Sequence, residues 1–322
     1  MCRVIILTYK NNNYTAFSHR TNTNQPMKNI QAYFAVVGSM FFWSFSFIWS
    51  KDALVIYSPF TILFFRLSLA AIVLLSIAKI LGKLNHIDKN DWKYFLLLSF
   101  FEPFLYFIGE TYGLQRVSST IAAVLIATIP LFLPYVAYYI FKERLTNYKI
   151  YGTILSFVGV VLVIINGNMS LNADVWGILL LMLAVFSAVA YTAVLNKLSH
   201  KYNSYTIVGW QSALALIGFG PLFFIYDRQE VISIGLVWEG VRPVLLLGLF
   251  ASIFAFVLFT YSIKKLGVTK SGIFSNAIPV FVSFYSFIFL NERLLFINYI
   301  GILIVVLGLF LSQMKKKDII QA

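Results

Sequence analysis

The stretch TIAAVLIATIPLFLPYVAYYIFKERLTNYKIYGTILSFVG, from Thr120 to Gly159, decides the fold because it occurs twice. The second copy, TKSGIFSNAIPVFVSFYSFIFLNERLLFINYIGILIVVLG, runs from Thr269 to Gly308, 149 positions further along the chain. Chance rarely aligns a proline, a charged triplet and two glycines in one register, so the protein is a duplicated unit. The gapless alignment pairs Thr120 with Thr269, Pro130 with Pro279, Glu143-Arg144-Leu145 with Glu292-Arg293-Leu294, Gly152 with Gly301, and Gly159 with Gly308.

The composition of the chain indicates a membrane protein. Of its 322 residues, 60% are hydrophobic and 11% are charged, whereas a soluble domain carries about 25% charged residues. The net charge of +13 could suggest nucleic-acid binding, but the basic residues lie in short loops between apolar segments, which is typical of membrane topology. The single cysteine, Cys2, excludes an intrachain disulfide. Motifs for metal binding, nucleotide binding and catalytic triads are missing, so we predict no metal, no cofactor and no enzyme activity.

The sequence predicts an all-α membrane protein with ten spans in two repeats. A spanning helix needs about 20 mostly apolar residues. The first repeat covers residues 28–167 and the second covers residues 174–314, each with five spans. Residues 1–27 are predicted to form a disordered polar tail, and residues 315–322 a basic tail. The predicted spans are 30–50, 58–80, 93–113, 119–141, 147–166, 175–197, 205–226, 243–263, 269–290 and 296–314.

The basic residues predict the orientation in the membrane. With the N-terminus inside, 19 Lys and Arg residues fall on the inner side and five on the outer side, and Arg66 lies within a span. This asymmetry predicts two cytoplasmic termini in an inner or plasma membrane. Because each repeat has an odd number of spans, the second repeat is inverted relative to the first. Inverted repeats are typical of secondary transporters, whose substrate site lies near the midplane between the halves.

The chain resembles the EamA-type transporters of the drug/metabolite transporter superfamily. The resemblance rests on WSFSFIWSK at Trp43–Lys51, on the spacing from Pro59 to Arg66, and on the doubled pattern of Pro, Glu-Arg-Leu and two Gly, and it covers nearly all of Lys28–Met314. It implies a ten-helix carrier with a central cavity lined mainly by spans one, three, four, six, eight and nine. Members of this family move amino acids, other small metabolites, sugars and drugs, mostly as exporters, so the substrate stays open.

Glu102 is the sharpest candidate for a functional residue. It lies near the middle of the third span, where a carboxylate is costly and normally faces a cavity or a partner. Pro103 follows it and should loosen the helix, which frees backbone carbonyls. The equivalent residue of the second repeat is Ala251, so the symmetry breaks here. Two interpretations stay open: Glu102 binds a substrate amine or a proton, or it forms a structural ion pair with Arg66.

Arg66 and Glu110 are the other charged residues predicted within this part of the membrane. Arg66 lies roughly two turns below the outer surface, near the depth of Glu102. The resemblance favours a structural clamp between spans two and three, and as a functional residue Arg66 would hold a substrate carboxylate. Glu110 lies two turns beyond Glu102 on the same face, which places it nearer the outer end as an interfacial group or a gate.

Polar and aromatic residues on the other cavity-lining spans complete the predicted substrate site. Asn276 precedes Pro279 by three residues and pairs with Ala127 of the first repeat, so it too breaks the symmetry. Prolines in these spans are predicted to set helix geometry rather than to contact substrate. The geometry set is Pro103, Pro130 and Pro279, and the predicted substrate-binding set is Glu102, Tyr106, Trp43, Ser46, Tyr191, Asn196, Ser275 and Asn276.

The sequence thus predicts a secondary active transporter that exports a small organic metabolite, such as an amino acid, by alternating access. Proton coupling through Glu102 is a hypothesis. The predicted partners are the lipid bilayer, the substrate and protons, without nucleic acid, and the oligomeric state is left open. One alternative is a broad-specificity exporter of lipophilic cations, which would depend on Glu102. Another class is a non-transporting scaffold or sensor, which would be packed solid through its midplane.

Overall fold

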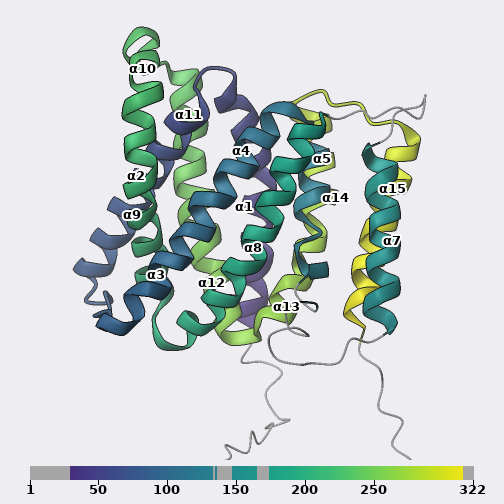
Figure 1. The fold of residues 1–322 in the computed structure, drawn as a ribbon, viewed down its shortest axis with the longest axis horizontal. Coiled ribbons are helices and arrows are strands. Elements are labelled where there is room, and N and C mark those ends of the chain that lie inside the picture. Colours follow the sequence, from purple (N-terminus) through teal and green to yellow (C-terminus); the bar gives the residue numbers. More distant parts are fainter. Residues whose placement is uncertain (1–29, 133–134, 136–146, 165–173, 315–322) are drawn as a thin grey trace, which may run out of the picture.

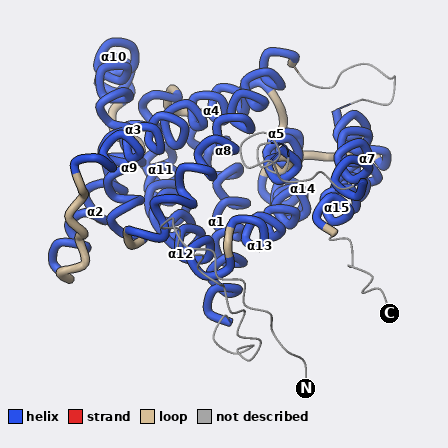
Figure 2. Tube along the Cα trace, turned by 60° about the horizontal axis from the view of Figure 1, so that its bottom comes forward, coloured by secondary structure: helices blue, strands red, loops and turns tan. Residues whose placement is uncertain are grey.

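The computed structural model describes residues 30–132, 135, 147–164 and 174–314. Every regular element within these ranges is a helix, and they contain no strand (Figures 1 and 2). The predicted tails at 1–27 and 315–322 and the first Glu-Arg-Leu triplet at 143–145 lie outside the described residues.

The helices of the first half begin where the local sequence favours a start. Pro59 lies in the first turn of its helix, where the missing N–H costs no hydrogen bond. Ser118 precedes another helix and its hydroxyl accepts from the N–H of Ile121 at 3.2 Å. The elements are α1 (Ile30–Leu54), α2 (Pro59–Ile80), the short η2 (Lys89–Asp91), α3 (Trp92–Ser99), the π-helical η3 (Phe100–Leu105), α4 (Tyr106–Arg116), α5 (Ser119–Ile126) and α7 (Asn147–Ile164).

The second half uses the same kinds of helix signal. Asp174 accepts from the N–H groups of Trp176 and Gly177, and Asn203 accepts from the N–H of Thr206; both are N-caps. The elements are α8 (Val175–Lys201), α9 (Ser204–Leu222), η4 (Phe223–Asp227), α10 (Arg228–Ile234), α11 (Trp238–Leu246), η5 (Leu247–Ala255), α12 (Phe256–Leu266), α13 (Val268–Ile273), η6 (Phe274–Ala277), α14 (Ile278–Phe289) and α15 (Phe296–Gln313).

The chain is a multi-pass membrane protein by the length and composition of its helices. Seven described helical segments are long and apolar enough to cross a membrane. Two shorter apolar helices, Ser119–Phe132 and Phe296–Ser312, lie in the predicted fourth and tenth spans. Many large apolar side chains on these helices are exposed on the outside of the bundle, such as Phe34, Ile72 and Ile217, as expected of a surface that faces lipid.

The packing of the helices follows the duplication. A shift of 149 residues maps α2 onto α9 and α7 onto α15, and each of these pairs packs together. The same shift maps α1 onto α8 and α4 onto α12. In the structure α1 packs against α12 and α8 packs against α4, which are two equivalent contacts. The halves are therefore related by a pseudo-twofold axis rather than placed side by side as independent domains.

The contacts between α7 and α15 reflect the pseudo-twofold relation of the halves. The two helices lie together at one side of the molecule, beyond α5 and α14 (Figures 1 and 2). A Cβ atom on Gly152 would lie 2.6 Å from the carbonyl oxygen of Gly308, and one on Gly159 would lie 2.7 Å from that of Gly301. Because Gly152 pairs with Gly301 in the repeat and yet contacts Gly308, the two helices are antiparallel. The absence of a Cβ lets their backbones approach closely.

Two transmembrane helices are interrupted at equivalent positions. The π segment η3 separates α3 from α4, and η5 separates α11 from α12; the shift places η3 inside η5. In the first half Glu102 has extended backbone angles (φ −146°, ψ 121°), which a following proline favours. The second half has Ser252 where the first has Pro103, so its interruption needs no proline at that place. Such π segments are frequent at functional sites.

Candidate functional site

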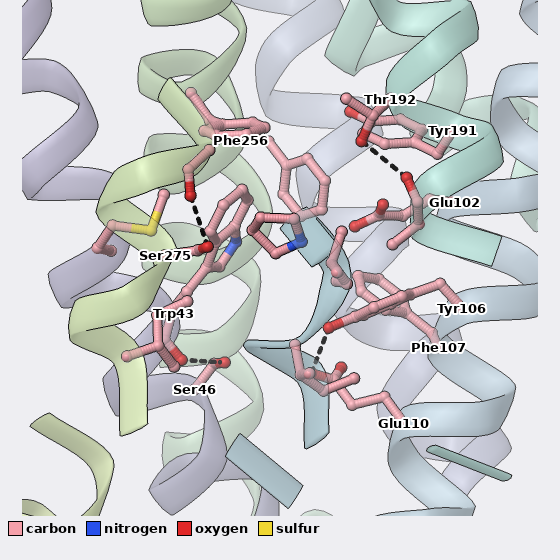
Figure 3. A pocket seen from close by; sticks show the side chains of 18 of the residues that line it. Trp43, Ser46, Glu102, Tyr106, Phe107, Glu110, Tyr191, Thr192, Phe256 and Ser275 are labelled. Carbon is pink, nitrogen blue, oxygen red and sulfur yellow. Dashed lines mark hydrogen bonds between the residues drawn. The ribbon is translucent and has the colours of Figure 1, made fainter. Parts of the chain in front are cut away.

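A cavity lies between the two interrupted helices, enclosed by both halves (Figure 3). Its volume is about 90 Å³, counted as room for the centres of water-sized spheres, and such a space holds several water molecules or a small organic molecule. The lining residues are Met40, Trp43, Ser46, Phe47, Arg66, Glu102, Tyr106, Phe107, Glu110, Ile126, Ile129, Pro130, Ala188, Tyr191, Thr192, Phe256, Phe259, Val268, Gly272, Ser275 and Ile278.

One wall of the cavity is charged, and all of its charges come from the first half. Glu102 is 6% exposed and forms no hydrogen bond with another described residue. Glu110, two turns further along, accepts from the hydroxyl of Tyr106 at 3.1 Å (Figure 3). A buried carboxylate without a partner is costly. A ligand or a proton that enters the cavity can compensate the Glu102 carboxylate.

Arg66 completes the charged wall and joins the two halves. Its Nε donates to the hydroxyl of Ser252 at 2.9 Å, and its guanidinium carbon lies 4.1 Å from the ring centroid of Phe107. Arg66 of α2 therefore contacts η5 of the second half as well as α4 of the first. The ion pairs of the described residues are Arg116 with Asp174 and Lys201 with Asp88 and Asp91. The Arg66–Glu102 pair that the sequence left open is thus not formed in this conformation.

The interrupted helix that presents Glu102 is held by a neighbour. Within the π segment, the carbonyl of Phe101 accepts a hydrogen bond from the N–H of Tyr106. Ser187 of α8 donates its hydroxyl to this carbonyl at 2.6 Å. The Glu102 segment is therefore fixed against α8, which supplies Tyr191 and Thr192 to the same cavity.

The opposite wall is aromatic and centres on Phe256 of the second half. The rings of Trp43, Phe107 and Tyr191 approach Phe256 at centroid distances of 5.2, 6.3 and 6.4 Å, with interplanar angles of 79°, 78° and 83°. These are edge-to-face contacts, the arrangement that aromatic pairs prefer. Phe256 is 3% exposed. It contacts rings from three helices, which makes it the hub of the aromatic wall.

The cavity straddles the pseudo-twofold axis, and several of its lining residues form repeat-related pairs. Phe107 pairs with Phe256, and both line the cavity. Glu110 pairs with Phe259, which also lines it. The duplication therefore gave both halves equivalent positions around the cavity. Later substitutions placed different side chains at some of these positions.

Most of the predicted substrate-binding residues meet in this cavity. Glu102, Tyr106, Trp43, Ser46, Tyr191 and Ser275 line it. The hydroxyls of Ser46 and Ser275 donate to the carbonyls of Trp43 and Gly272, both at 2.7 Å (Figure 3).

The two predicted asparagines lie outside the cavity. Asn196 is exposed, one turn beyond Thr192 on α8. Asn276 is 3% exposed, and neither polar atom of its amide has a hydrogen-bond partner among the described residues. Of the predicted geometry prolines, Pro103 lies within η3, Pro130 lines the cavity, and Pro279 lies in the first turn of α14.

The sequence prediction missed the aromatic hub. Phe107 and Phe256 are two of 32 phenylalanines, and composition does not separate rings that face a cavity from rings that face lipid. The repeat contained a usable signal. Both residues lie just after the π segment of an interrupted helix, and the 149-residue shift pairs them. Phe259, the counterpart of Glu110, could have been found in the same way.

An all-helical membrane bundle built from two repeats around a central cavity is the architecture of a secondary transporter. The EamA-like transporter family model matches this chain twice, over residues 30–165 and 175–314. The chain therefore belongs to that family. One match falls in each half of the chain.

Similar proteins match over most of this chain. A protein from Archaeoglobus fulgidus, named only as an uncharacterized transporter, is 25% identical over 89% of this chain and 99% of its own length. The transporter YetK of Bacillus subtilis is 27% identical over 79% of this chain and 78% of its own. A WAT1-related chloroplastic protein of Arabidopsis thaliana is 25% identical over 86% of this chain and 68% of its own.

A crystal structure of another protein shares the fold. It superimposes with a TM-score of 0.68 at 15% sequence identity, and the match covers 88% of this chain and 98% of the other. This likeness supports the helix arrangement described above.

Proposed function

We propose that the chain is a secondary active transporter that exports a small organic metabolite by alternating access. Ten spans in two inverted repeats would form the carrier. The count is supported by the seven long helices, the two shorter apolar helices and the interrupted segment from α3 through η3 to α4. The antiparallel packing of α7 against its repeat mate α15 supports the inversion.

Both termini are proposed to be cytoplasmic in an inner or plasma membrane. The helix α1 begins and α15 ends at the same end of the bundle (Figure 1). The turns at that end are rich in lysine, and the turns at the opposite end contain few basic residues, which favours the first end as the cytoplasmic one. The described lysines there include Lys79, Lys83, Lys89, Lys93, Lys201, Lys264 and Lys265.

The substrate is proposed to be an amino acid or a similar small zwitterion. The observation that carries this proposal is the unpartnered Glu102 carboxylate, which lines the same cavity as the guanidinium of Arg66. Glu102 would bind the amine. Arg66 uses only Nε in hydrogen bonds to described residues, so its terminal nitrogens can bind a carboxylate. The aromatic wall around Phe256 would hold the apolar body of the substrate.

A second candidate is an exporter of lipophilic cations. Two carboxylates line the cavity against one guanidinium, and aromatic rings attract cations. The two candidates differ in the role of Arg66. A zwitterion needs the guanidinium, so Arg66→Met should abolish its transport, whereas a cation should tolerate or even favour the loss of a positive charge.

Glu102 is also proposed to couple transport to protons. A single carboxylate that binds either a proton or a substrate amine would exchange the two across the membrane. The test is transport driven by a pH gradient in proteoliposomes, with wild-type protein, Glu102→Gln and the exposed control Glu239→Gln. We expect the gradient to drive transport in the wild type and the control but not in Glu102→Gln. Undiminished gradient-driven transport by Glu102→Gln would refute the coupling.

A further inference from the structure

At one end of the bundle, a carboxylate of the second half accepts hydrogen bonds from the first half. Glu292 lies in the loop between α14 and α15. Its Oε1 accepts from the N–H of Ser119 at 2.9 Å, and its Oε2 accepts from the N–H and the hydroxyl of Thr120 at 3.4 and 3.1 Å. These are the first residues of α5, where N–H groups lack helical partners and the helix dipole favours negative charge. Glu292 thus caps a helix of the other half.

Lys51 adds a third element to this end. It lies near the end of α1, and its Nζ donates to the carbonyl of Val117 at 2.7 Å. Val117 is at the turn between α4 and α5, two residues before Ser119. The carboxylate of Glu292 also acts electrostatically on Lys51. The ends of α1 and α4, the start of α5 and the loop of the other half therefore meet in one polar network.

This network lies between the cavity and the end of the bundle where α1 finishes. The lining residue of α5 closest to its start is Ile126, about 10 Å along the helix from Ser119. Every residue of α5 from Ser119 to Leu125 is buried, so packed side chains fill this distance. At the opposite end, the lining includes Val268 and Gly272 of α13, and α13 lies at the end where α1 begins (Figure 1).

The duplication preserved the two residue types of this contact. Thr120 pairs with Thr269, and Glu292 pairs with Glu143, which lies outside the described residues. The contact joins the threonine of one half to the glutamate of the other. A bond between halves that rock against each other must change when the cavity turns from one side to the other.

We propose that Glu292 is a gate residue: its hydrogen bonds to Ser119 and Thr120 hold the cavity closed at the end where α1 finishes, and they break before substrate passes that end. The inference rests on the proposed alternating access. With the orientation proposed above, this end is the outer face. Loss of the Glu292 carboxylate should then favour conformations that are open to the outside.

The test measures access to the cavity from each face. Ser46→Cys in a Cys2→Ser background places one thiol in the cavity lining, and a membrane-impermeant thiol reagent is applied to either side of oriented vesicles. Glu292→Ala should raise the labelling rate from the outer face by roughly tenfold, since hydrogen bonds to a charged group are lost. The exposed Glu239→Ala, at the same end of the bundle, should leave both rates unchanged.

The outcomes separate the gate from a simple helix cap. A lower melting temperature with an unchanged ratio of outer to inner labelling would mean that Glu292 only stabilises α5, and would overturn the gate. Failure of the parent Ser46→Cys protein to label from either face would instead count against alternating access itself.

A second variant does not depend on the folding of Glu292→Ala. Thr120→Cys with Glu292→Cys is linked by a short, cleavable thiol cross-linker in the Cys2→Ser background. The cross-linked protein should lose transport and regain it on cleavage, while the same reagent should leave the Cys2→Ser parent active. Full transport by the cross-linked protein would overturn the gate.

Discussion

The two walls of the cavity are built on equivalent helices but carry different side chains. Each is built on a helix interrupted by a π segment and followed by a phenylalanine, Phe107 in the first half and Phe256 in the second. The first wall adds Arg66, Glu102 and Glu110, whereas the repeat places Ala215, Ala251 and Phe259 at these positions. The shared residues build the common helix arrangement. Under the proposed function, the residues that differ would distinguish one substrate from another.

Removal of Arg66 is expected to have the largest effect on the charged wall. Arg66→Met deletes the only cation among the described lining residues and leaves two buried carboxylates. We expect a loss of roughly 3 kcal/mol in the free energy of unfolding. Glu110→Gln in the same background should restore part of the loss, because one fewer carboxylate remains uncompensated. Thermal unfolding of the four proteins of this double-mutant cycle measures the coupling, and strictly additive effects would contradict a shared electrostatic wall.

The axis between the halves should be less tolerant of added volume than an open position on α1. A Cβ on Gly152 would lie 2.6 Å from a backbone oxygen of α15, whereas one on Gly38 would meet only Leu258 at 3.4 Å. Gly152→Ala should therefore cost about 1–3 kcal/mol through overpacking. Gly38→Ala should be neutral or slightly stabilising, because alanine favours helix. Equal melting temperatures for the two variants would contradict the close packing of α7 and α15.

The aromatic wall can be tested by a substitution that keeps most of the side-chain volume of Phe256. Phe256→Leu removes three edge-to-face contacts, each worth about 0.5–1.5 kcal/mol, and we expect weaker or altered ligand binding together with a modest loss of stability. Phe296→Leu, on a ring that is 80% exposed, is the matched control. Isothermal titration calorimetry of both variants with one ligand measures the binding affinity. Unchanged affinity for Phe256→Leu would mean that Phe256 is not part of the binding site.

The smallest effect is expected at the lysine-rich end of the bundle. Lys201 and Tyr202 donate hydrogen bonds to Asp91 at 2.5 and 2.7 Å and lower the pKa of its carboxyl from the ordinary 3.8. The stabilising contribution is therefore present above pH 3.8 and is lost as the pH falls through the lowered pKa. Asp91→Asn should reduce the melting temperature slightly and equally from about pH 5 to about pH 8, and the difference should vanish in acid. A difference that grows in acid would contradict the assignment.

The duplication made much of the fold predictable. The two copies of Pro, Glu-Arg-Leu and Gly set the repeat boundaries, and the 149-residue shift relates every helix pair named above. Glu102 stood out because a carboxylate within an apolar span is costly. Trp43 and Ser46 followed from the motif at the end of span one.

Other features depended on contacts between the halves. Arg66 binds Ser252, 186 residues away, and no local pattern predicts that partner. The interruption at η5 has no proline at the position of Pro103. Asn196 is polar and near the predicted site, but α8 continues beyond the cavity there and leaves its side chain exposed.

The central claim is that the Glu102 carboxylate of the first wall binds the substrate. The most direct measurement is a thermal-shift screen of the purified protein against amino acids, nucleosides, sugars and drugs, repeated with Glu102→Gln and with the exposed Glu239→Gln. A ligand that stabilises the wild type and Glu239→Gln, but not Glu102→Gln, is the predicted result. A ligand that shifts Glu102→Gln as much as the wild type would contradict the claim.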